Sequence, residues 1–201
     1  MAELAREALE GGLPMATGGT TRDVGQFAAD VWTAHDLGLV LLVHRRDDGH
    51  VAEEVYYSTR DCGQCGDGRW SDAEPLGGGP LGFDLHDASA RARVLRGHAT
   101  AFVVETEVRL HTGRAAEDEG DEMVRVVGLL VTEEADFLEV GNLTEPASHR
   151  RPVPSGLALL AVLPGDRLHV QAVRSTPSGH APVGEGLELS YSPDATEYDW
   201  L

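Results

Sequence analysis

The stretch GLVLLVHRRDDGHVAEEVYYST, residues 38–59, decides the fold class of this chain. Its first part is a continuous apolar run of the kind found in strands that are buried on both faces. Residues 47–50, DDGH, follow as a tight turn in which Asp-Gly supplies the positive φ angle of a hairpin. Residues 51–59 then alternate, with Val51 and Val55 on one face, as a half-buried strand does. The stretch therefore predicts an antiparallel β-hairpin.

Short strands separated by turn signals continue through the back of the chain. The apolar and alternating segments are 99–112, 123–132, 136–141, 156–163, 167–174 and 187–191. In the first of them we expect Phe102, Val104, Val108 and Leu110 to face inward. Pro164-Gly165-Asp166 predicts a turn that joins 156–163 to 167–174 as a second hairpin, whereas the prolines of 142–156 predict an extended loop. About eight strands without βαβ alternation predict a mainly antiparallel β-sandwich, with an α+β layer fold as the alternative.

Helical patterns occur mainly near the N-terminus. Residues 2–10, AELAREALE, are strong helix formers that end before Gly11-Gly12. Residues 22–36 repeat apolar side chains at i, i+3, i+4 and i+7, which predicts an amphipathic helix covering a sheet, and 88–96 predicts a third, short helix. We expect one β-rich domain over residues 21–192, preceded by a flexible arm with a short helix at 1–20 and followed by an acidic tail at 193–201.

The charge of the chain narrows the range of partners. Its 34 acidic residues against 16 basic ones, all arginine, give a net charge of −18. This balance argues against binding to nucleic acid or to an anionic membrane surface, because both require clustered positive charge. The N-terminus lacks a basic start followed by an apolar run, which is the pattern of a secretory signal, and we therefore expect a cytoplasmic protein.

The glycine-rich stretch 61–87, DCGQCGDGRWSDAEPLGGGPLGFDLHD, predicts a long loop without regular structure. It contains both cysteines, Cys62 and Cys65, at a Cys-x-x-Cys spacing that lets two thiolates bind one metal ion. His86, which lies between two aspartates, is the candidate for a third ligand of a zinc ion. A redox pair and two ordinary loop cysteines are the alternatives, because a second Cys-x-x-Cys is absent from the sequence.

Two functions of different classes follow from these patterns. The first is a non-enzymatic protein-binding module, either an acidic inhibitor or immunity-type partner of a basic protein, or a protein that self-associates through a strand edge. This interpretation depends on the acidic charge, on the long loops and on the lack of a strong catalytic motif in the sequence. The alternative is a metal-binding protein or metal-dependent enzyme with its site in residues 61–87.

Overall fold

The protein has a mainly antiparallel β architecture that confirms the predicted fold class. The computed structural model describes residues 1–13, 25–60, 68–114, 121–144 and 148–191. Within these ranges the strands form three sheets. The first sheet holds β1 (Gln26–Ala34), β2 (Leu37–Arg45), β3 (Val51–Thr59) and β4 (Glu74–Pro80) in that order. The second sheet holds β5 (Thr100–Leu110), β6 (Glu122–Val131) and β9 (Leu157–Val162). The third sheet holds β7 (Phe137–Asn142), β8 (Ser148–Pro152), β10 (Arg167–Thr176), β11 (Gly179–Pro182) and β12 (Leu187–Ser190). The helices are α1 (Ala2–Gly11) and α2 (Ala88–Leu95).

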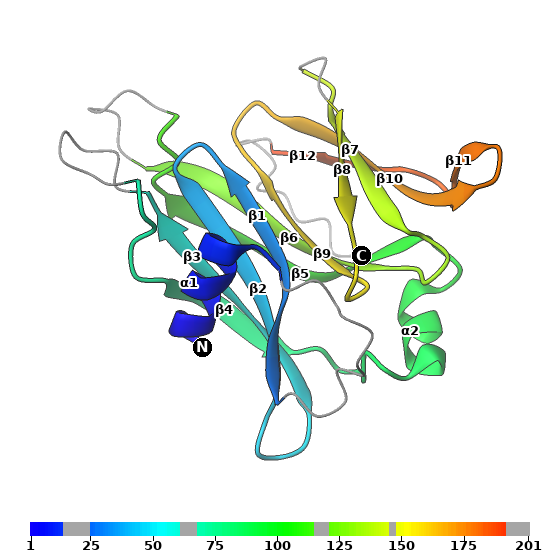
Figure 1. Cartoon of the computed structure of the whole chain (residues 1–201), viewed down its shortest axis with the longest axis horizontal. Helices are drawn as coiled ribbons and strands as arrows, with labels where there is room; N and C mark the ends of the chain where they lie inside the picture. Colours follow the sequence, from blue (N-terminus) through cyan, green and yellow to red (C-terminus); the bar gives the residue numbers. More distant parts are fainter. Residues whose placement is uncertain (14–24, 61–67, 115–120, 145–147, 192–201) are drawn as a thin grey trace, which may run out of the picture.

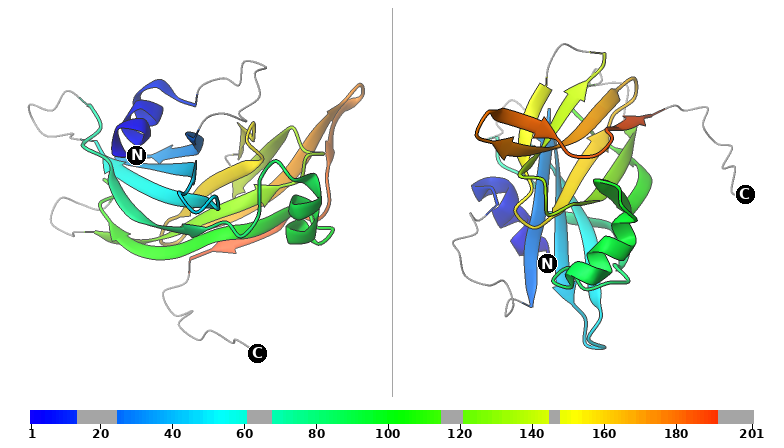
Figure 2. Two further views of the ribbon diagram at one scale, coloured as in Figure 1. Left: turned by 90° about the horizontal axis from the view of Figure 1, so that it is seen from below. Right: turned by 90° about the vertical axis from the view of Figure 1, so that its right-hand side faces the viewer.

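The sheets are stacked, with the second sheet in the middle and α1 on the outside of the first (Figure 1). Figure 2 shows α1 on one side of the β1–β4 sheet and the long strands β5 and β6 on the other side. Three apolar clusters fill the interfaces between α1 and the first sheet, between the first and second sheets, and between the second and third sheets. Strands β2, β6 and β9 are buried on both faces over most of their length, which explains their continuous apolar sequences.

Strand β2 shows how one sequence serves two interfaces. Leu39 and Leu41 face the second sheet, whereas Val40 and Leu42 face α1, and all four are fully buried. β2 pairs with β3 from Leu37 opposite Thr59 to Arg45 opposite Val51, so the predicted hairpin is confirmed.

The second predicted hairpin is wrong. β9 pairs with β6 in the second sheet, and β10 pairs with β7, β11 and β12 in the third, so the turn 164–166 links two sheets. Burial explains the separation, because every residue of β9 is buried whereas β10 has an exposed face. A strand that is apolar on both faces must be covered on both sides, as β9 is, whereas a strand with one polar face can leave that face to solvent, as β10 does.

The helix predicted over residues 22–36 is also wrong, because residues 26–34 form β1, which pairs with β2. A β-bulge between Ala28 and Asp30 shifts the register by one residue. Ala28 and Val31 consequently face α1, while Ala29 and Trp32 face the second sheet. Bulge-shifted apolar positions recur at spacings of three residues, which is the spacing that indicates a helix in a sequence.

Two further expectations about local structure need correction. Residues 74–80 and 148–152 form strands, although the sequence predicts loops there, and 179–182 form a further strand outside the predicted segments; the described residues contain twelve strands. Phe102 is 44% exposed, because a bulge between Phe102 and Val104 turns it outward. The short helices predicted at 2–10 and 88–96 are confirmed as α1 and α2.

The N-terminal helix lies against the first sheet. Ala5, Ala8 and Leu9 of α1 are buried against β2 and β3. Residues 14–20 of the expected flexible arm and the whole acidic tail at 193–201 lie outside the described residues. Among the helices that the structure describes, neither has the length and apolar character needed to cross a membrane.

A buried ion pair joins all three sheets. Asp30 of β1 accepts hydrogen bonds from Arg151 Nη2 of β8 and from the backbone N–H of Leu159 of β9, both at 2.6 Å. Arg151 Nη1 donates to the carbonyl oxygen of Leu159 at 2.8 Å. These side chains therefore satisfy backbone groups on the free edge of β9, which would otherwise be buried without partners.

Candidate functional site

The site is built around the glycine run of β4, which is an edge strand of the first sheet. Gly78 packs so closely on β3 that a Cβ atom there would lie 2.3 Å from the carbonyl oxygen of Glu53. Since backbone atoms cannot move aside cheaply, only glycine fits at this position. Gly77 to Gly79 carry no side chains, so this part of β4 contributes none to fill the space beside the strand.

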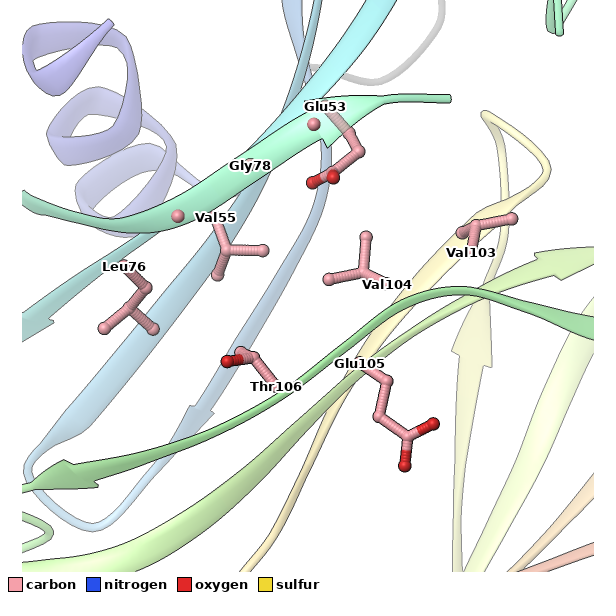
Figure 3. A pocket seen from close by; sticks show the side chains of 10 residues that line it. Glu53, Val55, Leu76, Gly78, Val103, Val104, Glu105 and Thr106 are labelled. Atoms are coloured by element: carbon pink, nitrogen blue, oxygen red, sulfur yellow. The ribbon is translucent and has the colours of Figure 1, made fainter. Parts of the chain in front are cut away.

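A cavity of about 270 Å³ lies between β4 and β5, the facing edge strand of the second sheet. Its walls are mainly apolar and come from Val55, Leu76 and Val104 (Figure 3). The side chain of Glu105 points away from the cavity, whereas the carboxylate of Glu53 points into it. The cavity is therefore an apolar slot with one acidic group inside.

Glu53 is the unusual residue of this cavity. Its exposed fraction is 6%, and Oε2 makes no hydrogen bond among the described residues. Burial raises the pKa of the carboxyl from 4.5 to about 7, a hydrogen bond from the backbone of Gly79 opposes the rise, and the charge of Glu54 adds to it. Because its pKa lies near neutrality, the group can donate a hydrogen bond when protonated and bind a cation when ionised.

The charges around Glu53 do not neutralise it. Glu105 is paired with Arg125, whose Nη2 lies 2.6 Å from Oε1 of the carboxylate. Glu54 points to the opposite face of β3, where Oε1 lies 3.2 Å from His44 Nε2 and Oε2 accepts a hydrogen bond from Tyr56 at 3.1 Å. No ion pair to Glu53 occurs in the part of the chain that the structure describes.

A second cavity, of about 510 Å³, lies on the other face of β3 and β4. It is lined by residues that include His44, Arg46, Glu53, Glu54, Tyr56 and the same glycines. β4 thus separates two cavities, and acidic side chains line both of them. An extended segment placed along β4 would meet acidic groups on either side of its backbone.

The predicted metal site is covered by the structure only at His86. Cys62 and Cys65 lie outside the described residues. His86 is exposed, and its backbone N–H donates to Asp84 Oδ1 at 2.9 Å. The described residues contain no group of three His, Cys, Asp or Glu side chains arranged to hold a metal ion. The zinc site therefore stays a prediction.

Sequence reasoning did not single out Glu53, although a signal was present. In residues 51–59 the alternation places Glu53 between Val51 and Val55, in the row that faces the core. A carboxylate in an apolar row either needs a buried partner or marks a site. The sequence predicts a loop at the glycine run 77–79. The place of this run beside the carboxylate follows only from the pairing of β4 with β3.

Comparison with known proteins finds no match among family models, curated proteins or solved structures. The geometry of a site and its charge, more than the fold, determine what a protein binds.

Proposed function

We propose that this protein is a non-enzymatic, cytoplasmic binding module that captures an extended segment of a basic partner protein. The observation that carries the proposal is the cavity between β4 and β5, where a buried acidic group faces two strand edges that are unpaired in the described residues. A strand edge binds an extended segment through backbone hydrogen bonds, and pockets beside it select the side chains.

The charge of the chain supports a basic partner. With a net charge of −18, the protein attracts cationic surfaces at long range and repels nucleic acid and anionic lipid. Electrostatic attraction of this kind mainly raises the association rate and weakens as salt is added. Edge strands supply the short-range part of the affinity, which salt changes little.

The test uses a fluorescent eight-residue peptide in which threonine and lysine alternate, titrated against the full chain at low and high salt. We expect saturable binding that weakens as salt is added. The control peptide has the same charge but proline in place of threonine, because proline cannot donate to a strand edge. Equal binding of both peptides would show attraction to charge alone and would refute capture by a strand edge.

Self-association through the same edge is the second form of this proposal. The unpaired edge of β4 in the described residues favours it, since a second copy of the chain could continue the first sheet. Sedimentation of the purified protein separates the two forms. A dimer that persists in high salt supports self-association, whereas a monomer at all salt concentrations leaves only a different protein as the partner.

A further inference from the structure

We propose that the cavity between β4 and β5 is a recognition pocket for one lysine or arginine side chain of the captured segment, with Glu53 as its counter-ion. This inference depends on the proposed function and specifies which type of partner residue the cavity binds. Its geometric basis is a carboxylate oxygen that is buried, points into a cavity and lacks a hydrogen bond among the described residues (Figure 3).

The walls of the cavity match the chemistry of a long basic side chain. Lysine and arginine have an aliphatic stem that favours apolar contacts and a charged end that needs an anion. Val55, Leu76 and Val104 provide the apolar contacts, and Glu53 provides the anion. A purely apolar side chain would leave the carboxylate buried without a partner, which is costly, so the pocket selects against it.

The strand edges allow such a side chain to enter from an extended backbone. Successive side chains of a strand point to opposite faces. A segment paired with β4 would direct alternate residues toward the cavity between β4 and β5, into which the Glu53 carboxylate points, and the other residues toward the cavity that Glu54 lines. A sequence with basic residues at alternate positions would therefore place them all on one face, and one of its two registers directs them to the Glu53 side.

Among the titratable groups around the pocket, Glu53 is the one whose protonation a bound cation would change. His44 of β2 and Arg46, which follows the end of β2, line the cavity on the opposite face. On β3, Glu54 raises the pKa of Glu53, and on β5 the charge of Glu105 is balanced by Arg125. The lining residues of β4, from Leu76 to Gly79, have no titratable side chain. A bound cation therefore acts on Glu53 and favours its ionised form.

Binding should consequently release a proton from Glu53. Since its pKa is about 7, roughly nine-tenths of the carboxyl is protonated at pH 6 and roughly one-tenth at pH 8. We expect the dissociation constant of the threonine–lysine peptide to fall about ten-fold from pH 6 to pH 8. Calorimetry at pH 6 in two buffers of different ionisation enthalpy should detect the release of about one proton per peptide.

The decisive variant is Glu53→Gln, with Glu107→Gln as the matched control. Both substitutions remove one negative charge, but Glu107 lies at an exposed position of β5. We expect Glu53→Gln to bind the peptide at least ten-fold more weakly at pH 8, with no proton release, and Glu107→Gln to bind as the wild type does. Circular dichroism confirms that each variant is folded.

The outcomes separate the pocket from the proposed function. If Glu53→Gln binds the peptide with the affinity and proton release of the wild type, the pocket assignment is wrong, although capture of a basic segment stands. If the wild type binds neither this peptide nor its arginine counterpart, both proposals are wrong. A peptide with norleucine at every lysine position should not bind, and equal binding of that peptide would also overturn the pocket.

Discussion

Replacing Glu53 with glutamine should stabilise the protein at high pH, because the buried carboxyl is ionised there and has no cationic partner among the described residues. Glutamine is nearly isosteric with the protonated acid and does not ionise. The folded-state pKa of about 7, against 4.5 for the unfolded chain, corresponds to about 3 kcal/mol of destabilisation when Glu53 is ionised. This is a large fraction of the free energy of unfolding of a typical domain, which is about 5–15 kcal/mol.

The effect has a defined pH dependence. Below pH 4.5 the carboxyl is protonated in both the folded and the unfolded state, and its contribution is constant. Between pH 4.5 and about 7 the folded state retains a proton that the unfolded state has lost, so stability falls as the pH rises. Above about pH 7 the loss is complete. The substitution should therefore change stability little near pH 5 and raise it most at pH 8.

Urea denaturation at pH 5, 6, 7 and 8 measures this directly. With a typical urea m-value of about 2 kcal/mol per molar, a gain of about 3 kcal/mol moves the midpoint by about 1 M or more at pH 8. The Glu107→Gln variant controls for the lower net charge, which by itself reduces self-repulsion in this acidic chain. If both variants shift the midpoint equally, or if the gain at pH 5 equals that at pH 8, then the carboxyl of Glu53 does not carry the destabilising charge.

Three other changes test separate parts of the structure. Asp30→Asn leaves its buried arginine partner without an anion and should lower the free energy of unfolding by about 3–5 kcal/mol, measured by urea denaturation. The control Asp48→Asn breaks a half-exposed ion pair and should lower it by at most about 1 kcal/mol, and an equal loss in both variants would contradict the reasoning. Gly78→Ala should separate β4 from β3, because its Cβ would meet backbone atoms of β3, and should increase hydrogen exchange at the amides of β4. Unchanged exchange would contradict the close approach of Gly78 to β3. If the predicted zinc site exists, elemental analysis of protein purified without a histidine tag should give about one zinc per chain, lost in the Cys62→Ser/Cys65→Ser double variant; wild-type protein without metal would remove that alternative.

A strand could be predicted where its sequence alternates because one face is buried, or is continuously apolar because both faces are buried. The hairpin of β2 and β3 and the apolar strands β6 and β9 meet this condition. The strand β1 does not, because its bulge at Ala28 and Asp30 breaks the alternation on which strand prediction depends. The pairing of β9 with β6 depends on the layer in which each strand lies, and a turn between neighbouring segments contains no information about layers.

The candidate site was hidden for a related reason. A run such as Gly77-Gly78-Gly79 has no side chains to form a pattern, so β4 could only be recognised from its partner β3. The sequence places Glu53 in an apolar row, but the lack of a hydrogen-bond partner for its Oε2 among the described residues depends on the arrangement of the neighbouring strands. The local sequence indicates which face of a strand a residue occupies, whereas the cavity depends on how strands of different sheets pack against each other.

Stability and binding make opposite demands on Glu53, and this opposition connects the two tests. The Glu53 carboxyl has no cationic partner among the described residues and weakens the fold near neutral pH, and an apolar residue or glutamine would avoid the cost. Proteins tolerate such local conflicts mainly at functional sites. A Glu53→Gln variant that is more stable at pH 8 but binds the basic peptide more weakly would therefore identify the group as one kept for recognition. A variant that is more stable and binds equally well would show that the charge serves neither the fold nor this ligand.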